Sequence, residues 1–472
     1  MSKFQKDLTQ GSVAKHLIRF SLPFLAANLL MALYNMADMF FVGRFNGAVG
    51  ATAVGVGGQV TILEYNLVAG LAVGGTILIA QNIGANRLEN VRKTIGSMFT
   101  LYGIIGAALT VIMLIANPYI IRLLVSDPLA YPETLKYVNV CTTGLLFIFG
   151  YNAVSAVLRG MGDSKHPLVF VAIAAAINIG LDWYLCGPQD MGAQGAAIAT
   201  VVAQGISFVI SLVFLRRSEF IFDFKLKSFK IDKQMTKQLF KIGLPSSCGA
   251  TLTSFSFMVL TGVANALAGI VGNTALSVTG KVNSVAILPA FAMQSSVSSM
   301  AGQNIGAGKP DRALKTTLTA VGLTLAITSV MLVLVQLFAG PITHFFIGDE
   351  TGGLSPEVAA QCLEQTAVYI RSLSWDYLVV SVAFNFMGLA MAAGHTTFSM
   401  LNGVIASLAV RVPAAYLLGT YFGLKGMGFA APIATGFSAI VLLIYVLRGS
   451  WRKSKVITPE SQQETESVTV TN

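Results

Sequence analysis

The chain repeats two of its own segments at long separations. QNIGA at positions 81–85 recurs at 303–307, and AAIAT at 196–200 recurs as APIAT at 431–435. Leu22-Pro23 also recurs as Leu244-Pro245, at the same separation as the QNIGA copies. Both copies are strongly apolar. Two related apolar halves are typical of membrane transporters, in which one half rocks against the other about a central cleft.

Composition places both halves in a lipid bilayer. Hydrophobic residues make up 54% of the 472 and charged residues 11%, against about a quarter charged in soluble domains. Apolar runs of about 20 residues, the length that crosses the hydrocarbon, occur twelve times. An all-α membrane protein is expected, because helices satisfy their own backbone in lipid. The expected spans are 15–41, 52–80, 95–116, 133–158, 166–186, 193–215, 238–262, 273–300, 316–339, 358–390, 396–418 and 427–448.

The basic residues predict the orientation of these spans. Of 31 Lys and Arg residues, 24 fall at the two ends of the chain and in the loops after even-numbered spans. We therefore expect both termini to be cytoplasmic. This clustering between spans, rather than nucleic-acid binding, accounts for the net charge of +10. Residues 1–15 are polar and precede a long apolar run, so no cleaved signal is expected.

Six spans in each copy give two pseudo-symmetric lobes. An even number makes the copies parallel repeats, related by an axis along the membrane normal. We expect an N-lobe at 1–215, a cytoplasmic linker with a short surface helix at 216–237, a C-lobe at 238–448 and a disordered cytoplasmic tail at 449–472.

Ionisable residues inside spans are candidates for function, because a charge in the hydrocarbon costs several kcal/mol. The mid-span set is Asp38, Glu64, Asp182, Lys281, Arg371, Asp376 and Arg411. At the separation of the QNIGA copies, Asp38 aligns with Leu260 and Glu64 with Ala286. Helix contacts common to both halves would tend to be duplicated, so these carboxylates indicate a special site in the first half.

Four residues of the first half make up the predicted cation site. Asn178 and Asp182 are four residues apart and share one helix face, Asp38 lies deep in span one, and Thr200 lies near the start of span six. If these faces converge, their oxygens suit a hard monovalent cation or a proton. The alternative is a polar network that joins the helices.

Candidates for a substrate cleft come from polar or soft side chains within spans: Tyr34, Met31, Phe41, Glu64, Gln294, Ser298 and Asp376. Methionine and aromatic surfaces accept many apolar shapes, although such residues also pack against neighbours or lipid. Glu64 lines the cleft or joins a network with Asn66 or Gln59. Asp376 lines the cleft or pairs with Arg371 or Lys281. For Arg411 a structural role near Pro413 is favoured.

The motifs of soluble enzymes are missing from the sequence. There is no P-loop for ATP, and neither the four His nor the four Cys residues have the spacing of a metal site. The cysteines are expected as small core residues. We expect no enzyme activity, no cofactor, and no metal beyond a coupling Na⁺ if the ion is not H⁺.

Six sequence segments together resemble the multidrug and toxic compound extrusion (MATE) transporters of prokaryotes. They are Leu8-Thr9-x-Gly11-Ser12, Phe20-x-Leu22-Pro23, the stretch from Asp38 to Gly43-Arg44, Gln81-Asn82-x-Gly84-Ala85, Leu158-Arg159-Gly160-x-Gly162-Asp163, and Gly192-x-x-Gly195-Ala196-Ala197-x-Ala199-Thr200. The resemblance covers residues 8–448. It implies two six-helix lobes that export cationic amphipathic drugs in exchange for Na⁺ or H⁺, with Asp38, Asn178, Asp182 and Thr200 at the N-lobe cation site.

The sequence departs from part of that family in span seven. Some members carry a Glu there, and residues 251–257 here contain none. The resemblance therefore favours the prokaryotic branch that relies on the N-lobe, and it implies a location in the plasma (inner) membrane of a prokaryote. The partners implied are small cationic drugs and the lipid bilayer, with the chain acting as a monomer. The alternative function is a flippase for lipid-linked sugars. It would need several cleft Arg or Lys residues, and only Lys281, Arg371 and Arg411 are available.

Overall fold

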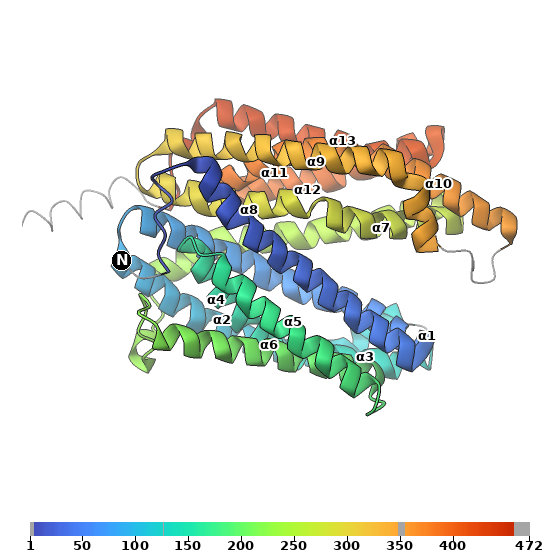
Figure 1. The fold of residues 1–472 in the computed structure, drawn as a ribbon, viewed down its shortest axis with the longest axis horizontal. Helices are drawn as coiled ribbons and strands as arrows, with labels where there is room; N and C mark the ends of the chain where they lie inside the picture. The colour runs from blue at the N-terminus through green and yellow to red at the C-terminus, as the bar shows by residue number, and fades with distance from the viewer. Residues whose placement is uncertain (1–3, 126, 348–354, 457–472) are drawn as a thin grey trace, which may run out of the picture. The chain divides into compact units, whose positions relative to one another are not determined.

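A computed structural model of the chain describes residues 4–125, 127–347 and 355–456, and all regular structure in these ranges is helical. The chain divides into two compact units (Figure 1). The first unit comprises Met1–Leu8 and Leu22–Ser247, and the second comprises Thr9–Ser21 and Cys248–Asn472. The predicted linker at 216–237 thus belongs to the first unit. The predicted disordered tail at 449–472 is wrong for residues 449–456, which are ordered with Trp451 buried, and residues 457–472 lie outside the described residues.

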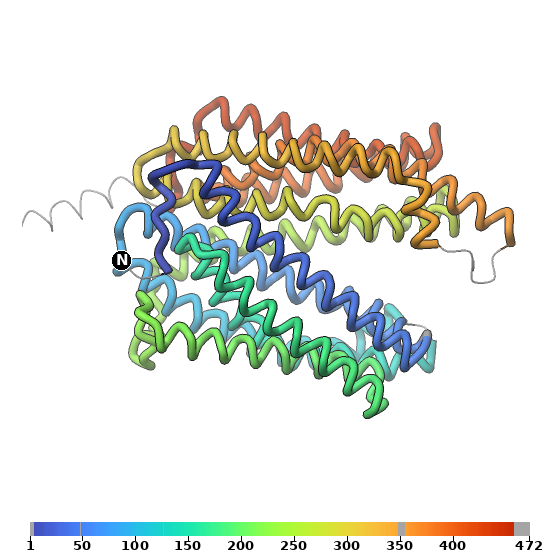
Figure 2. The backbone as a smooth tube through the Cα atoms, viewed as in Figure 1, coloured from blue at the N-terminus to red at the C-terminus, as the bar shows by residue number. Residues whose placement is uncertain are grey.

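Helices of the first half run side by side along a common direction (Figure 2). The linker contains the short predicted helix as a single 3-10 turn, η1. The elements are α1 (Val13–Gly84), α2 (Leu88–Leu124), α3 (Ala130–Thr143), α4 (Leu145–Gly160), α5 (Lys165–Cys186), α6 (Gly192–Arg217) and η1 (Leu226–Ser228).

The second half has the same kind of bundle, with one π-helical segment, η2. Its elements are α7 (Lys233–Ala286), α8 (Leu288–Gly306), α9 (Pro310–Ile347), α10 (Pro356–Ser374), α11 (Asp376–Ala392), α12 (Thr396–Val404), η2 (Ile405–Arg411), α13 (Val412–Leu447) and η3 (Ser450–Arg452).

Glycine breaks divide the longest helices into separate spans. Gly47 in α1, Gly269 in α7 and Gly423 in α13 have φ values of 63°, 54° and 61°. Glycine adopts this left-handed region without a steric penalty, so the helix can turn back there. The pair α3 and α4 is bent by 46° at Gly144 and together forms one span. The described residues contain the twelve predicted spans when, in addition, residues 270–286 of α7 are joined to α8, α10 is joined to α11, and α12 and η2 are joined to the first part of α13.

The duplication predicted from the sequence extends to the backbone. Gly47 and Gly269 are both left-handed and have the same separation as the QNIGA copies, and so do Asn86 and Gly308. Gly162 and Gly394 are also both left-handed. Their separation along the chain is larger than that of the QNIGA copies and smaller than that of AAIAT and APIAT. The break between α3 and α4 also has a counterpart, between α10 and α11. Each half therefore folds as one copy of the same six-span unit.

Packing differs between the inside of each unit and its surface. The cores are made of small and branched apolar residues, including Cys141 and Cys186 in the first unit. Cys362 is also buried, as predicted, whereas Cys248 is exposed, so the expectation of a core position is wrong for that residue. Long exposed apolar faces on helices such as α2 and α9 fit a bilayer, because the hydrocarbon of the lipids, rather than water, would contact them.

Candidate functional site

Close packing of α5 on α6 positions three of the four predicted cation-site residues. α6 begins with small residues, and Gly195 lies so near Leu185 that an added Cβ would be 3.1 Å from its backbone. Ala193, Ala196, Ala197 and Ala199 are buried against α5 and the neighbouring helices. Such small side chains let helix backbones approach closely. The short side chains of Asn178 and Thr200 can therefore reach each other.

The turn before α5 fixes where that helix starts. The backbone N–H of Lys165 donates to Asp163 Oδ1 at 2.9 Å, and Asp163 also contacts Lys6 and the His166 ring at 3.6 and 2.5 Å. Burial works against the charge of Asp163, but the hydrogen bond from His166 and the charge of Lys6 outweigh it and hold the pKa of Asp163 below its usual value. An ionised Asp163 thus caps α5.

A chain of hydrogen bonds joins three helices at the predicted site. Asn178 Nδ2 on α5 donates to Thr200 Oγ1 on α6 at 3.2 Å, and Thr200 Oγ1 donates to Asp38 Oδ2 on α1 at 3.2 Å. Asp182 lies one turn beyond Asn178, close enough to Asp38 for their carboxyl groups to interact. The structure thus brings together all four residues that the sequence singled out.

Three of the four residues present buried oxygen atoms that lack hydrogen-bond partners among the described residues. Asp38, Asn178 and Asp182 are only 5, 1 and 0% exposed. Among the residues described, Asp38 Oδ1, Asn178 Oδ1 and both oxygens of Asp182 have no hydrogen-bond partner. A buried polar atom without a partner is costly and calls for an explanation such as a bound ion or water. Two neighbouring carboxylates with unmatched oxygens fit a monovalent cation or a shared proton.

Three of the remaining first-half candidates, Tyr34, Met31 and Phe41, lie on α1 near Asp38 in the sequence. Tyr34 is buried one turn from Asp38, and its Oη accepts a hydrogen bond from Gln204 Nε2 at 3.3 Å. Sequence reasoning missed Gln204, although it lies four residues after Thr200 and so on the same face of α6. Met31 is partly buried. Phe41 is also partly buried, and its ring contacts those of Phe40 and Phe45.

Glu64 lies in a separate polar network. Thr142 Oγ1 on α3 donates to Glu64 Oε1 at 3.1 Å, and Asn117 Nδ2 on α2 contacts Thr142 Oγ1 and Asn139 Oδ1 at 3.1 and 3.0 Å. Glu64 is 4% exposed. These partners come from α2 and α3, and a network of Glu64 with Asn66 or Gln59 stays a prediction. A place for Glu64 in the substrate cleft stays a prediction.

The second-half candidates lie inside the second unit. Ser298 is buried and donates to the Gly388 carbonyl of α11 at 3.3 Å, and Gln294 Nε2 lies 3.7 Å from Met391 Sδ. Asp376, 7% exposed at the start of α11, lies close enough to Arg411 for their charges to interact and within hydrogen-bonding reach of Thr435. Thr435 is the repeat counterpart of Thr200.

The other two basic residues considered for Asp376 have different contacts. Arg371 Nε donates to the Gln336 carbonyl at 3.2 Å, and Lys281 lies over the ring of Phe346. Arg411 itself lies 4.7 Å from the centre of the Phe257 ring. Of the three basic residues, Arg411 lies near enough for its charge to act on Asp376, but no ion pair joins Asp376 to Arg371, Lys281 or Arg411 in the described residues, and Asp376 Oδ1 has no hydrogen-bond partner there.

Comparison with known proteins matches both halves of the chain to one family. The family model MatE matches residues 23–184 and again residues 245–417, and the two matches start at the repeated prolines. Among related proteins, "Probable multidrug resistance protein YpnP" of Bacillus subtilis is 28% identical and covers 96% of this chain and 99% of its own length. "Multidrug export protein MepA" of Staphylococcus aureus is 23% identical over 93% of this chain and 95% of its own length.

Solved structures have the same fold. A crystal structure of MATE in complex with MaL6 superposes with a TM-score of 0.88 at 24% identity, covering 94% of this chain and 98% of that one. An outward-facing multidrug resistance MATE family transporter gives a TM-score of 0.87, with 94% and 98% covered, again at 24% identity. At this level of identity the likeness concerns the fold.

Proposed function

The chain belongs to the MatE family of transporters, and on that premise we propose that it exports small amphipathic cations in exchange for Na⁺ or H⁺. It is a multi-pass membrane protein, and we propose that it works as a monomer. The names of its relatives, which are multidrug resistance and export proteins, support the substrate class. The exchange is supported by the buried oxygens of Asp38, Asn178 and Asp182.

The hydroxyl of Thr200 organises the proposed coupling site. A hydroxyl has one proton and two lone pairs. Thr200 uses the proton toward Asp38 and one lone pair toward Asn178, which leaves the Asn178 Oδ1 atom as a free acceptor. Asp38 and Asp182 then supply negative charge, and the hydrogen bonds hold Asp38 in place before the ion arrives.

Charge balance provides the proposed coupling. With neither cation nor proton bound, two buried carboxylates repel each other and lack counter-charge, which is costly in a medium of low dielectric constant. Binding Na⁺ or a proton removes part of that cost, and so does binding a cationic substrate nearby. The two cations would therefore compete for one charge, so that entry of the coupling ion releases the drug.

The flippase alternative has less support from the second unit. A pyrophosphate group would need free cations, but Arg371 donates to a backbone carbonyl, and Lys281 and Arg411 lie over the rings of Phe346 and Phe257. A cation exporter needs no such group.

Efflux of ethidium from proteoliposomes under separately imposed Na⁺ and H⁺ gradients tests the proposal. One gradient should drive efflux of the dye. Asp38→Asn and Asp182→Asn should each abolish it, and the double variant should be little worse than either single one, because members of one functional unit are non-additive. Ethidium affinity should fall with rising Na⁺ or falling pH, and this dependence should vanish in Asp182→Asn. Dependence that persists unchanged in Asp182→Asn would refute the site.

The proposed orientation has its own test. Both termini and the linker at 216–237 are proposed to be cytoplasmic, since most basic residues lie on that side. Lys227→Cys, made in a Cys248→Ser background to remove the exposed native thiol, should resist a membrane-impermeant maleimide added to intact cells. Efficient labelling from outside would reverse the orientation.

A further inference from the structure

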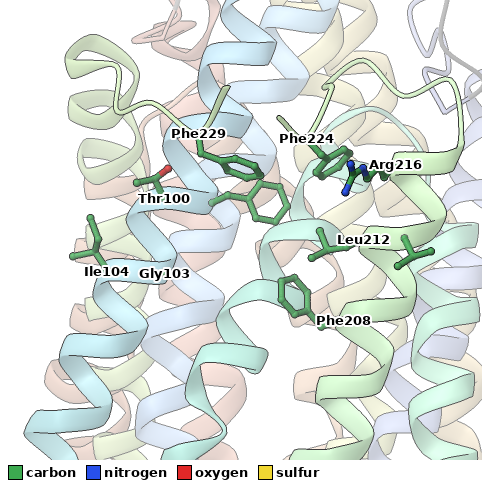
Figure 3. Close-up of a pocket in the computed structure, with 10 residues that line it drawn as sticks. Thr100, Gly103, Ile104, Phe208, Leu212, Arg216, Phe224 and Phe229 are labelled. Atoms are coloured by element: carbon green, nitrogen blue, oxygen red, sulfur yellow. The ribbon is translucent and has the colours of Figure 1, made fainter. Parts of the chain in front are cut away.

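The first unit has an apolar groove of about 530 Å³ that the transport site does not use. α2 lines it around Gly103, α6 lines it from Phe208 to Arg216, and the linker adds Phe224 and Phe229 (Figure 3). The groove lies at the end of α6 where the helix meets the linker. Its lining includes none of the four residues of the cation site.

The linker that lines one side of this groove is held to α2 by several contacts. Gly96 allows the contact, because an added Cβ there would clash with the Ser228 carbonyl oxygen. Ser97 Oγ donates to the Lys230 carbonyl at 3.3 Å and accepts from the Asp232 backbone N–H at 2.8 Å. Arg92 Nε donates to the Ile221 carbonyl at 3.0 Å. The linker is thus a defined part of the fold.

Phe224 has an unusual backbone conformation at the mouth of the groove. Its φ is +51°, a region that bulky residues rarely adopt. The ring stacks on Phe220 with 5.7 Å between centroids and meets Phe99 and Phe222 edge-on at 6.2 and 5.2 Å. Strained conformations of this kind persist where the surroundings enforce them, often at ligand-binding sites. In this conformation the Phe224 ring lies beside Arg216 (Figure 3).

Charge selects the kind of ligand that fits. Arg216 is the single charged side chain that lines the groove, it is exposed, and it has no ion pair among the residues described. Phe208 lies eight residues earlier on α6, about 12 Å along the helix axis. A ligand therefore meets a guanidinium at one end and an apolar wall below it. Guanidinium groups bind phosphate through paired hydrogen bonds and repel cations, so a lipophilic cation is a poor fit.

We propose that this groove binds one anionic phospholipid, with its phosphate at Arg216 and an acyl chain along α2 and α6. Basic pockets between membrane helices bind anionic headgroups, and such lipids are concentrated in the cytoplasmic leaflet. The choice of leaflet rests on the orientation proposed above. The binding itself does not, because it can be measured on purified protein without an ion gradient or a defined orientation.

Native mass spectrometry of the full-length protein with equimolar phosphatidylglycerol and phosphatidylcholine tests the site. The wild type should retain one phosphatidylglycerol with a preference of about fivefold, the effect expected of one Arg at a membrane surface. Arg216→Gln should bind both lipids equally. Gly103→Leu should lose both, because its side chain would enter the groove, where an added Cβ meets nothing within 4 Å.

A matched control lies in the other half of the chain. Gly322 is on α9, the counterpart of α2, and its Cβ would also meet open space. Gly322→Leu should bind phosphatidylglycerol like the wild type. Equal preference in the wild type and Arg216→Gln, or unchanged lipid binding in Gly103→Leu, would overturn the proposal. Competition with the lipophilic cation tetraphenylphosphonium gives a further test. If it displaced the lipid from the wild type as effectively as from Arg216→Gln, the groove would be a drug site and the proposal would be wrong.

Discussion

The two halves share a backbone plan but differ in how they handle buried charge. In the first, Asp38 and Asp182 lie close together with unpartnered oxygens. In the second, Asp376 also has one unpartnered oxygen among the described residues, but it is a single carboxylate that lies near enough to Arg411 for their charges to interact. Each half uses the same repeated threonine, Thr200 or Thr435, near its carboxylate. Since the scaffold is duplicated, the difference lies in the counter-charge: the second half carries its own cation, and the first must obtain one from outside.

This contrast supports a single coupling site. Arg411 is held by the Phe257 ring and by its place at the end of the π-helix η2, so its charge cannot leave. A fixed cation stabilises a carboxylate but cannot be exchanged across a membrane. Only a site with an exchangeable cation or proton can link an ion gradient to transport. The comparison therefore favours coupling in the first half and structural stabilisation in the second.

Removing the charge of Asp38 should have the largest effect. Asp38→Asn should reduce gradient-driven ethidium efflux to below about a hundredth of the wild-type rate, as expected when an interaction worth roughly 3 kcal/mol is lost. The aligned position in the second half, Leu260, is the control. Leu260→Met keeps volume and polarity and should transport normally. Wild-type efflux in Asp38→Asn at matched expression would remove the distinction between the halves.

Substitution of the two repeated threonines should have the second-largest effect, and it should differ between the halves. Thr200→Val removes the hydroxyl that joins Asn178 to Asp38, and we expect the Na⁺ or proton concentration for half-maximal drug release to rise about tenfold. Thr435→Val makes the same change beside Asp376 and should leave that concentration within about twofold. Both are measured as ethidium binding against Na⁺ and pH. An equal shift in the two variants would mean that both halves bind the coupling ion.

The sequence predicted much of this scaffold because the signals were local or duplicated. Span lengths follow from apolar runs, and the shared face of Asn178 and Asp182 follows from their spacing of four. Partners across helices were not predictable in this way. The hydrogen bonds of Thr142 to Glu64 and of Gln204 to Tyr34, and the placing of Arg411 near Asp376, depend on how each helix is rotated against its neighbour. That rotation is set by packing of whole helix surfaces.

Removing the charge of Arg411 in the second half should lower the stability of the protein more than it affects coupling. Arg411→Gln leaves Asp376 buried without its cation and should destabilise the purified protein by about 3 kcal/mol. Adding Asp376→Asn should recover part of that loss, because the two residues interact. Arg371→Gln is the control, since Arg371 contacts the Gln336 carbonyl, and its effect should add to that of Asp376→Asn. Thermal unfolding in detergent measures all four. Simple additivity for Arg411 and Asp376 would show that they are not partners.

The smallest expected effect concerns pH, at two equivalent turns of the repeat that carry Asp163 in one half and His395 in the other. Burial lowers the pKa of His395, and the charge of Lys455 lowers it further. Its ring also contacts Tyr445 Oη at 2.6 Å. The pKa of Asp163 is lowered as well. In both cases the unfolded chain binds protons more readily than the folded one, so stability falls as pH falls.

The pH ranges in which His395 and Asp163 affect stability differ, so their effects can be told apart. His395 should cost stability as pH drops below about 6.5, the ordinary His value, whereas Asp163 should do so only below about 3.9. His395→Gln should therefore flatten the loss of unfolding temperature between about pH 6.5 and 5, while Asp163→Asn leaves that part of the curve unchanged. Thermal unfolding across this range measures both. If Asp163→Asn flattened the curve near neutral pH and His395→Gln did not, the ionisation states assigned to the two turns would be wrong.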